Sequence, residues 1–63
     1  MPIIEVNLFE GRSVDQKRQL IAAMTDAVVE SIAVPRENVR IILRELDKDD
    51  FGIGGKTATD IGR

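Results

Sequence analysis

The fold is decided by residues 13–32, which read SVDQKRQLIAAMTDAVVESI, and by the apolar segments on either side of them. Ser13 and Gln16 have the spacing of a capping box, in which each side chain bonds the other residue's backbone N–H group. Behind this cap, apolar positions recur at helical spacing and predict one apolar stripe. The stripe comprises Leu20, Ile21, Met24, Ala27, Val28, Ser31 and Ile32. The helix should end before Pro35, because a proline disfavours helical geometry in the residue before it.

The segments on both sides of this helix have the pattern of β-strands. Residues 3–9 (IIEVNLF) alternate between two faces, and residues 39–46 (VRIILREL) are rich in β-branched side chains. A strand, a helix and a second strand predict a parallel pair with a right-handed crossover. Because one helix covers only one face of this pair, the opposite face, with Phe9, Ile42 and Leu46, needs a partner chain.

A glycine-rich segment follows the second strand. Residues 47–50 form a charged turn, and residues 51–56 (FGIGGK) predict a hairpin or tight turn near the C-terminus. They are not a phosphate-binding loop, because the GxxxxGK[ST] pattern is absent. We therefore predict one α+β domain over residues 1–63, a βαβ unit with parallel strands and a C-terminal hairpin.

Composition narrows the possible functions. A chain of 63 residues buries only about 60% of its unfolded surface, so a lone monomer would be marginally stable. With no Cys and no His, disulfides and most metal sites are excluded, and self-association becomes the expected source of stability. A net charge of −2 argues against a nucleic-acid partner. We find no apolar run long enough to span a membrane and no signal peptide, and we expect a cytoplasmic protein.

The same composition limits the available catalytic groups. Without His, Cys, Tyr or Trp, the chain's own α-amine is the only group whose ordinary pKa, roughly 7.7–8.0, is close to neutral pH. Pro2 follows Met1, and removal of Met1 would expose a secondary amine. Apolar walls and nearby cations would lower the pKa of that amine and make it a base. The alternative is that Pro2 merely opens the first strand.

Arg12, Arg40 and Phe51 are the other candidates for a site. Arg40 lies in an otherwise apolar strand, where a cation is costly unless it meets a carboxylate of the protein or of a ligand. The planar fork of an arginine suits a carboxylate or an enolate oxygen. The alternative is a structural ion pair or a solvent-facing charge on a sheet face, and we expect this for Arg18, Arg36 and Arg44. Phe51 is either a core residue or a pocket wall that excludes water.

Four short motifs along the chain match the pattern of a known family. They are Met1-Pro2-Ile3, Glu10-Gly11-Arg12-Ser13 ahead of Asp15-Gln16-Lys17, Val39-Arg40, and Phe51-Gly52-Ile53-Gly54-Gly55. In type and spacing they resemble the 4-oxalocrotonate tautomerase (2-hydroxymuconate tautomerase) family over the whole chain. The resemblance implies a βαβ tautomerase unit, usually assembled as a homohexamer built as a trimer of dimers.

The resemblance also implies a reaction and roles in it, without a cofactor or metal. Pro2 would be the general base that takes the 2-hydroxyl proton of 2-hydroxymuconate and returns one to C5, giving 2-oxo-3-hexenedioate. Arg40 would bind the C1 carboxylate and polarise the 2-oxygen, and Arg12 would hold the distal carboxylate. Phe51 would be the aromatic wall beside the amine, with Phe9 also lining the pocket. Residues of one site would come from neighbouring subunits.

The residues at two positions, Phe9 and Ile53, differ from those in related proteins. Two alternative functions also remain. Phe9 stands where relatives often have a smaller aliphatic residue, which bears on pocket shape and substrate preference. Phe9 and Ile53 also occupy the neighbourhoods where related dehalogenases carry an arginine and an acidic residue, which argues against dehalogenation. The alternatives are a non-catalytic, oligomeric protein that binds organic acids, and one subunit of a heterohexamer.

Overall fold

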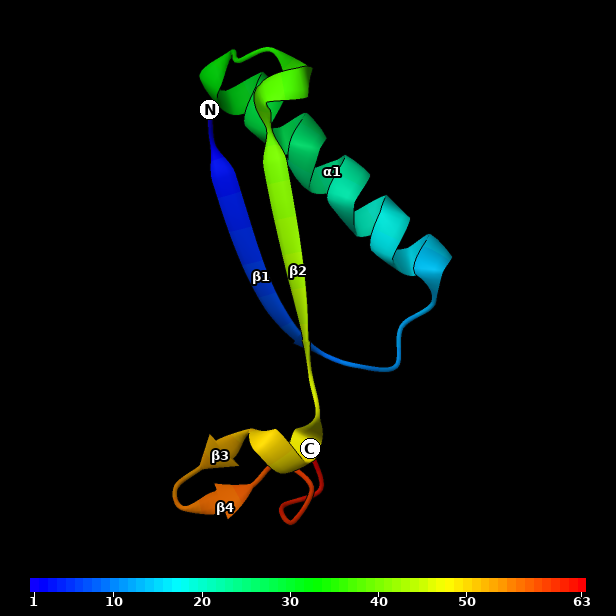
Figure 1. The fold of residues 1–63 in the computed structure, drawn as a ribbon, viewed down its shortest axis with the longest axis vertical. Coiled ribbons are helices and arrows are strands. Elements are labelled where there is room, and N and C mark those ends of the chain that lie inside the picture. Colours follow the sequence, from blue (N-terminus) through cyan, green and yellow to red (C-terminus); the bar gives the residue numbers. More distant parts are fainter.

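The computed structural model describes all residues from 1 to 63, and the predicted elements occur in the predicted order (Figure 1). The strands and the α-helix are β1 (Ile3–Phe9), α1 (Val14–Ile32), β2 (Arg40–Leu46), β3 (Gly52–Ile53) and β4 (Lys56–Thr57). Two short 3-10 helices, η1 (Arg36–Asn38) and η2 (Lys48–Asp50), precede and follow β2. The predicted α+β class, a βαβ unit with a C-terminal hairpin, is confirmed.

The two long strands pair in parallel without an offset. Ile3 lies opposite Arg40 at one end of the pair, and Phe9 lies opposite Leu46 at the other. The backbone N–H of Arg40 also donates to the Pro2 carbonyl at 3.0 Å, which extends the ladder beyond the first pair. Residues near the starts of β1 and β2 are therefore neighbours, and so are residues near their ends.

The helix between the strands begins at the predicted capping box. The Ser13 hydroxyl accepts from the Gln16 backbone N–H at 3.1 Å, and the Gln16 side chain accepts from the Ser13 N–H at 3.0 Å. These bonds satisfy backbone donors that the first helical turn leaves free. An ion pair of 2.7 Å between Lys17 and Glu45 fastens the start of α1 to the end of β2. The connection after β1 is therefore held at a defined place beside the sheet.

The second strand starts one residue later than predicted. The backbone N–H of Val39 donates to the Arg36 carbonyl at 3.1 Å and closes the turn of η1. This donor is unavailable to the sheet, so β2 begins at Arg40 rather than at Val39. The charged segment 47–50 is similarly more regular than a plain turn, because the Asp47 side chain caps η2.

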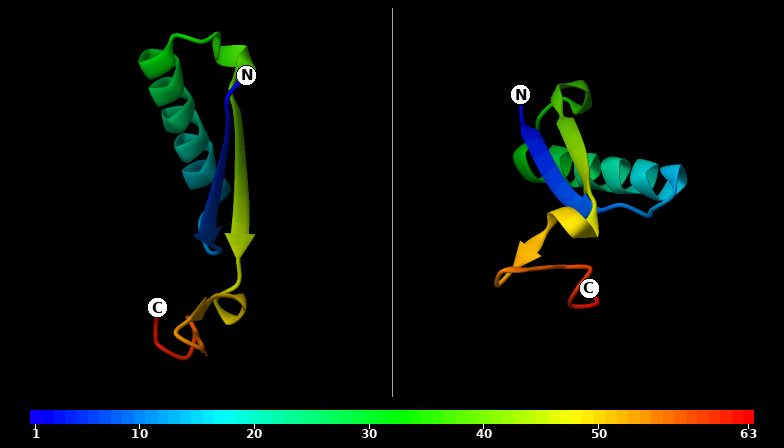
Figure 2. Two further views of the ribbon diagram at one scale, coloured as in Figure 1. Left: turned by 90° about the vertical axis from the view of Figure 1, so that its left-hand side faces the viewer. Right: turned by 60° about the horizontal axis from the view of Figure 1, so that its bottom comes forward.

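Helix α1 covers one face of the β1–β2 pair and leaves the other bare (Figure 2). On the open face, the side chains of Ile3 and Ile42 remain 57% and 39% exposed. The apolar stripe of α1 is also covered less than predicted, because two strands are too narrow for it: Ile21 and Ile32 are exposed. None of the helices has the length and apolarity that crossing a bilayer requires.

Little of the chain is buried in one copy. The only fully buried residue is Ala58. The exposed area is 4707 Å², whereas a compact monomer of 7.0 kDa would expose about 4000 Å². The molecule is long and flat, with extents of 43 × 24 × 13 Å. A closed apolar core is therefore missing from the single chain.

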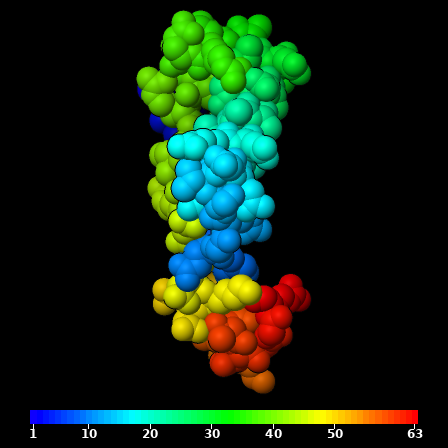
Figure 3. All heavy atoms as spheres, turned by 90° about the vertical axis from the view of Figure 1, so that its right-hand side faces the viewer, coloured from blue at the N-terminus to red at the C-terminus, as the bar shows by residue number.

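The C-terminal hairpin lies beyond the carboxyl ends of the long strands (Figures 1 and 3). Gly54 and Gly55 connect β3 to β4 with φ angles of 60° and 86°, a left-handed pair that favours glycine and matches the twist of a hairpin. The tail then folds back, since the Arg63 N–H donates to the Ala58 carbonyl at 2.9 Å. This compact end places the tail beside the end of β1.

Removing the helix cap should lower stability. We expect Ser13→Ala to reduce the free energy of unfolding by about 1 kcal/mol, because it frees a backbone donor at the helix start. Urea denaturation at one fixed protein concentration would measure this. Ser31→Ala is the matched control, since the Ser31 hydroxyl donates only to carbonyls within the helix, those of Ala27 and Val28. Equal midpoints for the two variants would contradict the role of the cap.

Candidate active site

The structure divides the predicted site residues between the two ends of the β1–β2 pair. Pro2 and Arg40 lie at the amino end, whereas Phe9, Arg12 and Phe51 belong to the carboxyl end. Strand β1 has 7 residues, so at roughly 3.3 Å per residue the two ends lie about 20 Å apart. One copy of the chain therefore presents two separate groups of candidate residues.

The amino end holds Pro2 and a guanidinium that has no carboxylate partner. Pro2 is half-buried, and its carbonyl accepts the backbone N–H of Arg40. Its nitrogen belongs to the peptide bond with Met1 in the full sequence. The Arg40 side chain donates to the backbone carbonyls of Glu37 and Val39. Arg40 is exposed, and its remaining N–H groups have no partner within the chain.

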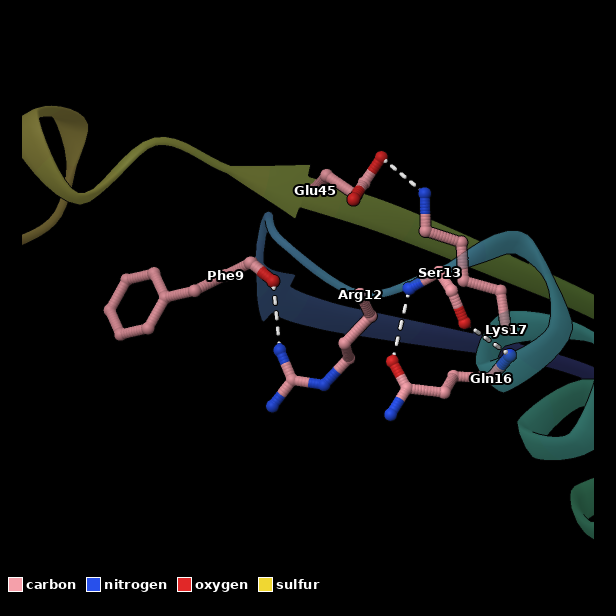
Figure 4. Close-up of polar contacts among 6 residues, drawn as sticks. All are labelled: Phe9, Arg12, Ser13, Gln16, Lys17 and Glu45. Carbon is pink, nitrogen blue, oxygen red and sulfur yellow. Dashed lines mark hydrogen bonds and ion pairs between the residues drawn. The ribbon is translucent and has the colours of Figure 1, made fainter.

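The carboxyl end is organised around Phe9. The Arg12 guanidinium donates to the Phe9 carbonyl at 2.9 Å, while the Phe9 ring points away from Arg12 (Figure 4). The ring meets Phe51 edge to face, with a centroid distance of 5.3 Å and an interplanar angle of 86°. This contact joins the end of β1 to the hairpin and makes an aromatic wall from two distant parts of the sequence.

A groove of about 320 Å³ opens beside this wall. It is lined by Asn7, Leu8, Phe9, Leu46, Phe51, Ile53 and Arg63. The lining contains five apolar side chains and no acidic side chain. The ammonium of Lys48 also lies 5.8 Å from the centroid of the Phe9 ring. Such a groove suits a flat, apolar molecule with a negative charge at one end.

The ion pairs distinguish the arginines with a structural role from Arg12 and Arg40, the candidate site residues. As expected, Arg18 pairs with Asp15, Arg36 with Asp26 and Arg44 with Glu5. Neither Arg12 nor Arg40 forms an ion pair within the chain. An ion pair of either arginine with an acidic residue of the same copy is thus not observed, and both arginines are exposed.

One ion pair lies on the open face of the sheet. The Arg44 guanidinium donates to the Glu5 carboxylate at 2.9 Å. This hydrogen bond, together with the attraction between the two charges, holds the pKa of Glu5 below its ordinary range and raises the pKa of Arg44. No cluster of three or more His, Cys, Asp or Glu side chains is placed to hold a metal ion.

Sequence reasoning missed two cations at the groove. Arg63 lines the groove, and Lys48 lies over the ring of Phe9, because η2 and the C-terminal tail fold back toward β1, and no periodicity predicts this. Leu46, which the strand pattern placed on the same face as Phe9, lies opposite Phe9 and also lines the groove.

Comparison with known proteins bears directly on these observations. A family model described as tautomerase enzyme matches residues 2–61. The chain belongs to the tautomerase family. It is 44% identical to a 2-hydroxymuconate tautomerase of Stutzerimonas stutzeri over 63 residues, which is 100% of both chains. A probable tautomerase of Listeria innocua is 43% identical over 61 residues, covering 97% of this chain and 100% of that one.

Solved structures of the tautomerase family have the same fold. A 4-oxalocrotonate tautomerase isozyme from Methylibium petroleiphilum superposes with a TM-score of 0.89 and 40% identity, over 98% of this chain and 100% of that one. A heterohexamer 4-oxalocrotonate tautomerase from Chloroflexus aurantiacus gives 0.88 and 30%, over 97% and 98%. The resemblance drawn from the sequence motifs is confirmed. This chain is therefore an isomerase of the tautomerase kind.

The Glu5–Arg44 pair should make stability depend on pH. Because the pKa of Glu5 is lower in the folded chain, the pair stabilises the fold above the ordinary glutamate pKa of about 4.3. This contribution is lost as the pH falls through the lowered value. Thermal unfolding of Glu5→Gln should therefore occur below the wild-type temperature at pH 7, and the difference should become smaller as the pH is lowered toward 3.

Glu30→Gln is the matched control, because Glu30 is an exposed carboxylate that forms no ion pair. Its unfolding temperature should follow that of the wild type at both pH values. A Glu5→Gln difference that persists unchanged at pH 3 would contradict the assignment to ionised Glu5.

Proposed function

We propose that the chain converts 2-hydroxymuconate to 2-oxo-3-hexenedioate, with the amine of Pro2 as the general base. The observation that carries the proposal is the pairing of Arg40 with Pro2: a backbone bond of 3.0 Å joins them, and the Arg40 guanidinium has no carboxylate partner. Relatives named 2-hydroxymuconate tautomerase, 44% and 43% identical to this chain, support the substrate.

Removal of Met1 is the first requirement, because the nitrogen of Pro2 has no basic lone pair while it is an amide. The free, neutral amine then takes the proton of the 2-hydroxyl group and becomes a cation. The electron pair of the broken O–H bond forms the 2-oxo group, and the diene electrons shift toward C5. The protonated amine returns a proton to C5, so the product is an isomer of the substrate and the amine is regenerated.

The arginines stabilise the two ends of the substrate in this proposal. Arg40 binds the C1 carboxylate and faces the 2-oxygen, where negative charge develops as the proton leaves. Arg12 holds the distal carboxylate and draws electron density toward C5. Phe51 and Phe9 form the apolar wall that keeps water from the amine, and an apolar surrounding favours the neutral form of that amine.

We further propose that each site is assembled from more than one copy. The amino-end and carboxyl-end groups lie about 20 Å apart in one copy, too far to contact one small substrate together. The open sheet face, where Ile3 and Ile42 are exposed, supports self-association. The proposed assembly is a homohexamer, a trimer of dimers, in the cytoplasm.

Replacing the proposed base tests the mechanism. We expect Pro2→Ala to lower kcat by about a hundredfold, within the range that a general base contributes, because a primary amine replaces the secondary one. Ultraviolet absorbance would follow the conversion of 2-hydroxymuconate. Intact mass would verify that Met1 is absent from both proteins, and sedimentation would verify equal assembly. Turnover within twofold of the wild type would refute the role of Pro2.

Replacing Arg12 tests the contact with the distal carboxylate. Arg12→Ala should lower kcat/KM for 2-hydroxymuconate by at least about tenfold, the effect of losing one charge-assisted hydrogen bond. The same dienol without the distal carboxylate should be affected by less than twofold. Arg18→Ala is the matched control, since Arg18 pairs only with Asp15. Equal losses for the two substrates would argue against this contact.

A further inference from the structure

We propose that Lys48 is a further substrate-binding residue, which shares the distal carboxylate of a dicarboxylate enol acid with Arg12. This inference rests on the proposed function, because it concerns the same substrate and the same end of the site. It assigns a role to a cation that forms no ion pair in the chain.

The surroundings of Lys48 show why its charge remains available. Asp47, Asp49 and Asp50 flank it in the sequence, yet none of them forms an ion pair with it. The Asp47 carboxylate accepts the Asp49 N–H at 2.8 Å, and the Asp49 carboxylate accepts the Thr59 hydroxyl at 2.6 Å. Two of the three neighbouring carboxylates are therefore engaged within the turn and the tail.

The ammonium of Lys48 lies instead over the ring of Phe9, 5.8 Å from its centroid. This distance allows a cation–π contact, which orients the ammonium without neutralising it. The edge-to-face contact with Phe51 fixes the ring in turn. Lys48 is thus held beside a groove wall rather than extended freely into water.

Phe9 connects Lys48 with Arg12. Its carbonyl accepts from the Arg12 guanidinium at 2.9 Å, and its ring carries the Lys48 ammonium. Two cations therefore approach the same residue, one from its backbone and one from its side chain. Phe9 also lines the groove, whose lining contains no acidic side chain. Neither cation forms an ion pair within the chain, so both can bind the carboxylate of a bound molecule.

The chemistry of the two cations suits a carboxylate held at the rim of an apolar groove. Arg12 offers a planar fork with fixed directions, and Lys48 offers a compact charge on a flexible stem. The unsaturated carbon chain of the substrate would lie against Phe9 and Phe51, and its distal carboxylate would meet both cations. An acid with a single carboxylate, bound through Arg40, would make neither contact.

Substitution of Lys48 by methionine separates charge from packing, because methionine keeps an unbranched side chain that can still cover the Phe9 ring. For Lys48→Met we expect KM for 2-hydroxymuconate to rise roughly fivefold, the effect of losing a partly exposed ion pair, with kcat unchanged. KM for the dienol without the distal carboxylate should change by less than twofold. Lys48→Arg should restore the wild-type KM.

Lys56→Met is the matched control, since Lys56 is an exposed lysine of β4 that forms no ion pair and does not line the groove. It should leave both KM values unchanged. If Lys48→Met and Lys56→Met behave alike, or if Lys48→Met changes both substrates equally, the inference is overturned and the proposed function stands.

A binding measurement keeps the inference testable without turnover. Calorimetric titration with adipate, a saturated six-carbon dicarboxylate, should show roughly fivefold weaker binding to Lys48→Met than to the wild type. Hexanoate, with one carboxylate, should bind the two proteins equally. A wild type that binds adipate through Lys48 but does not convert 2-hydroxymuconate would refute the proposed function alone. Equal adipate affinity in the two proteins would refute the role of Lys48.

Discussion

The parallel pairing of β1 with β2 is the constraint on which the remainder of this structure depends. Because the strands run in the same direction without an offset, their starts and their ends form two distinct places on the molecule. The crossover between them is α1, and one helix shields only one side of the sheet. The same connection that makes the fold therefore leaves its other side, with Ile3 and Ile42, exposed to water.

The positive charges that have no carboxylate partner lie near the two ends of the sheet. The arginines of the helix, of η1 and of the open sheet face are neutralised by nearby carboxylates, so their contribution is structural and small at the surface. Arg12 and Arg40 lie just beyond β1 and at the start of β2, and backbone carbonyls rather than carboxylates accept their hydrogen bonds. The positive charge of each therefore remains available to an anion at one end of the sheet.

Much of this arrangement could be predicted from the sequence because it depends on local rules. Ser13 and Gln16 specify the helix start, and Gly54 with Gly55 specifies the hairpin turn. The groove could not be predicted in the same way, since long-range packing of the hairpin and tail brings Arg63 into its lining and Lys48 over the ring of Phe9. The sequence motifs predict the candidate residues of the site. In a single chain, however, these residues lie in two groups at opposite ends of the β1–β2 pair.

The separation of the two ends of the sheet has a genetic consequence. In the proposed assembly, every copy contributes an amino-end half to one site and a carboxyl-end half to another. A subunit defective at Pro2 and a subunit defective at Arg12 would then be faulty in different halves. Mixed assemblies of the two would contain some sites built entirely from intact halves, so two inactive alleles would complement each other within one cell.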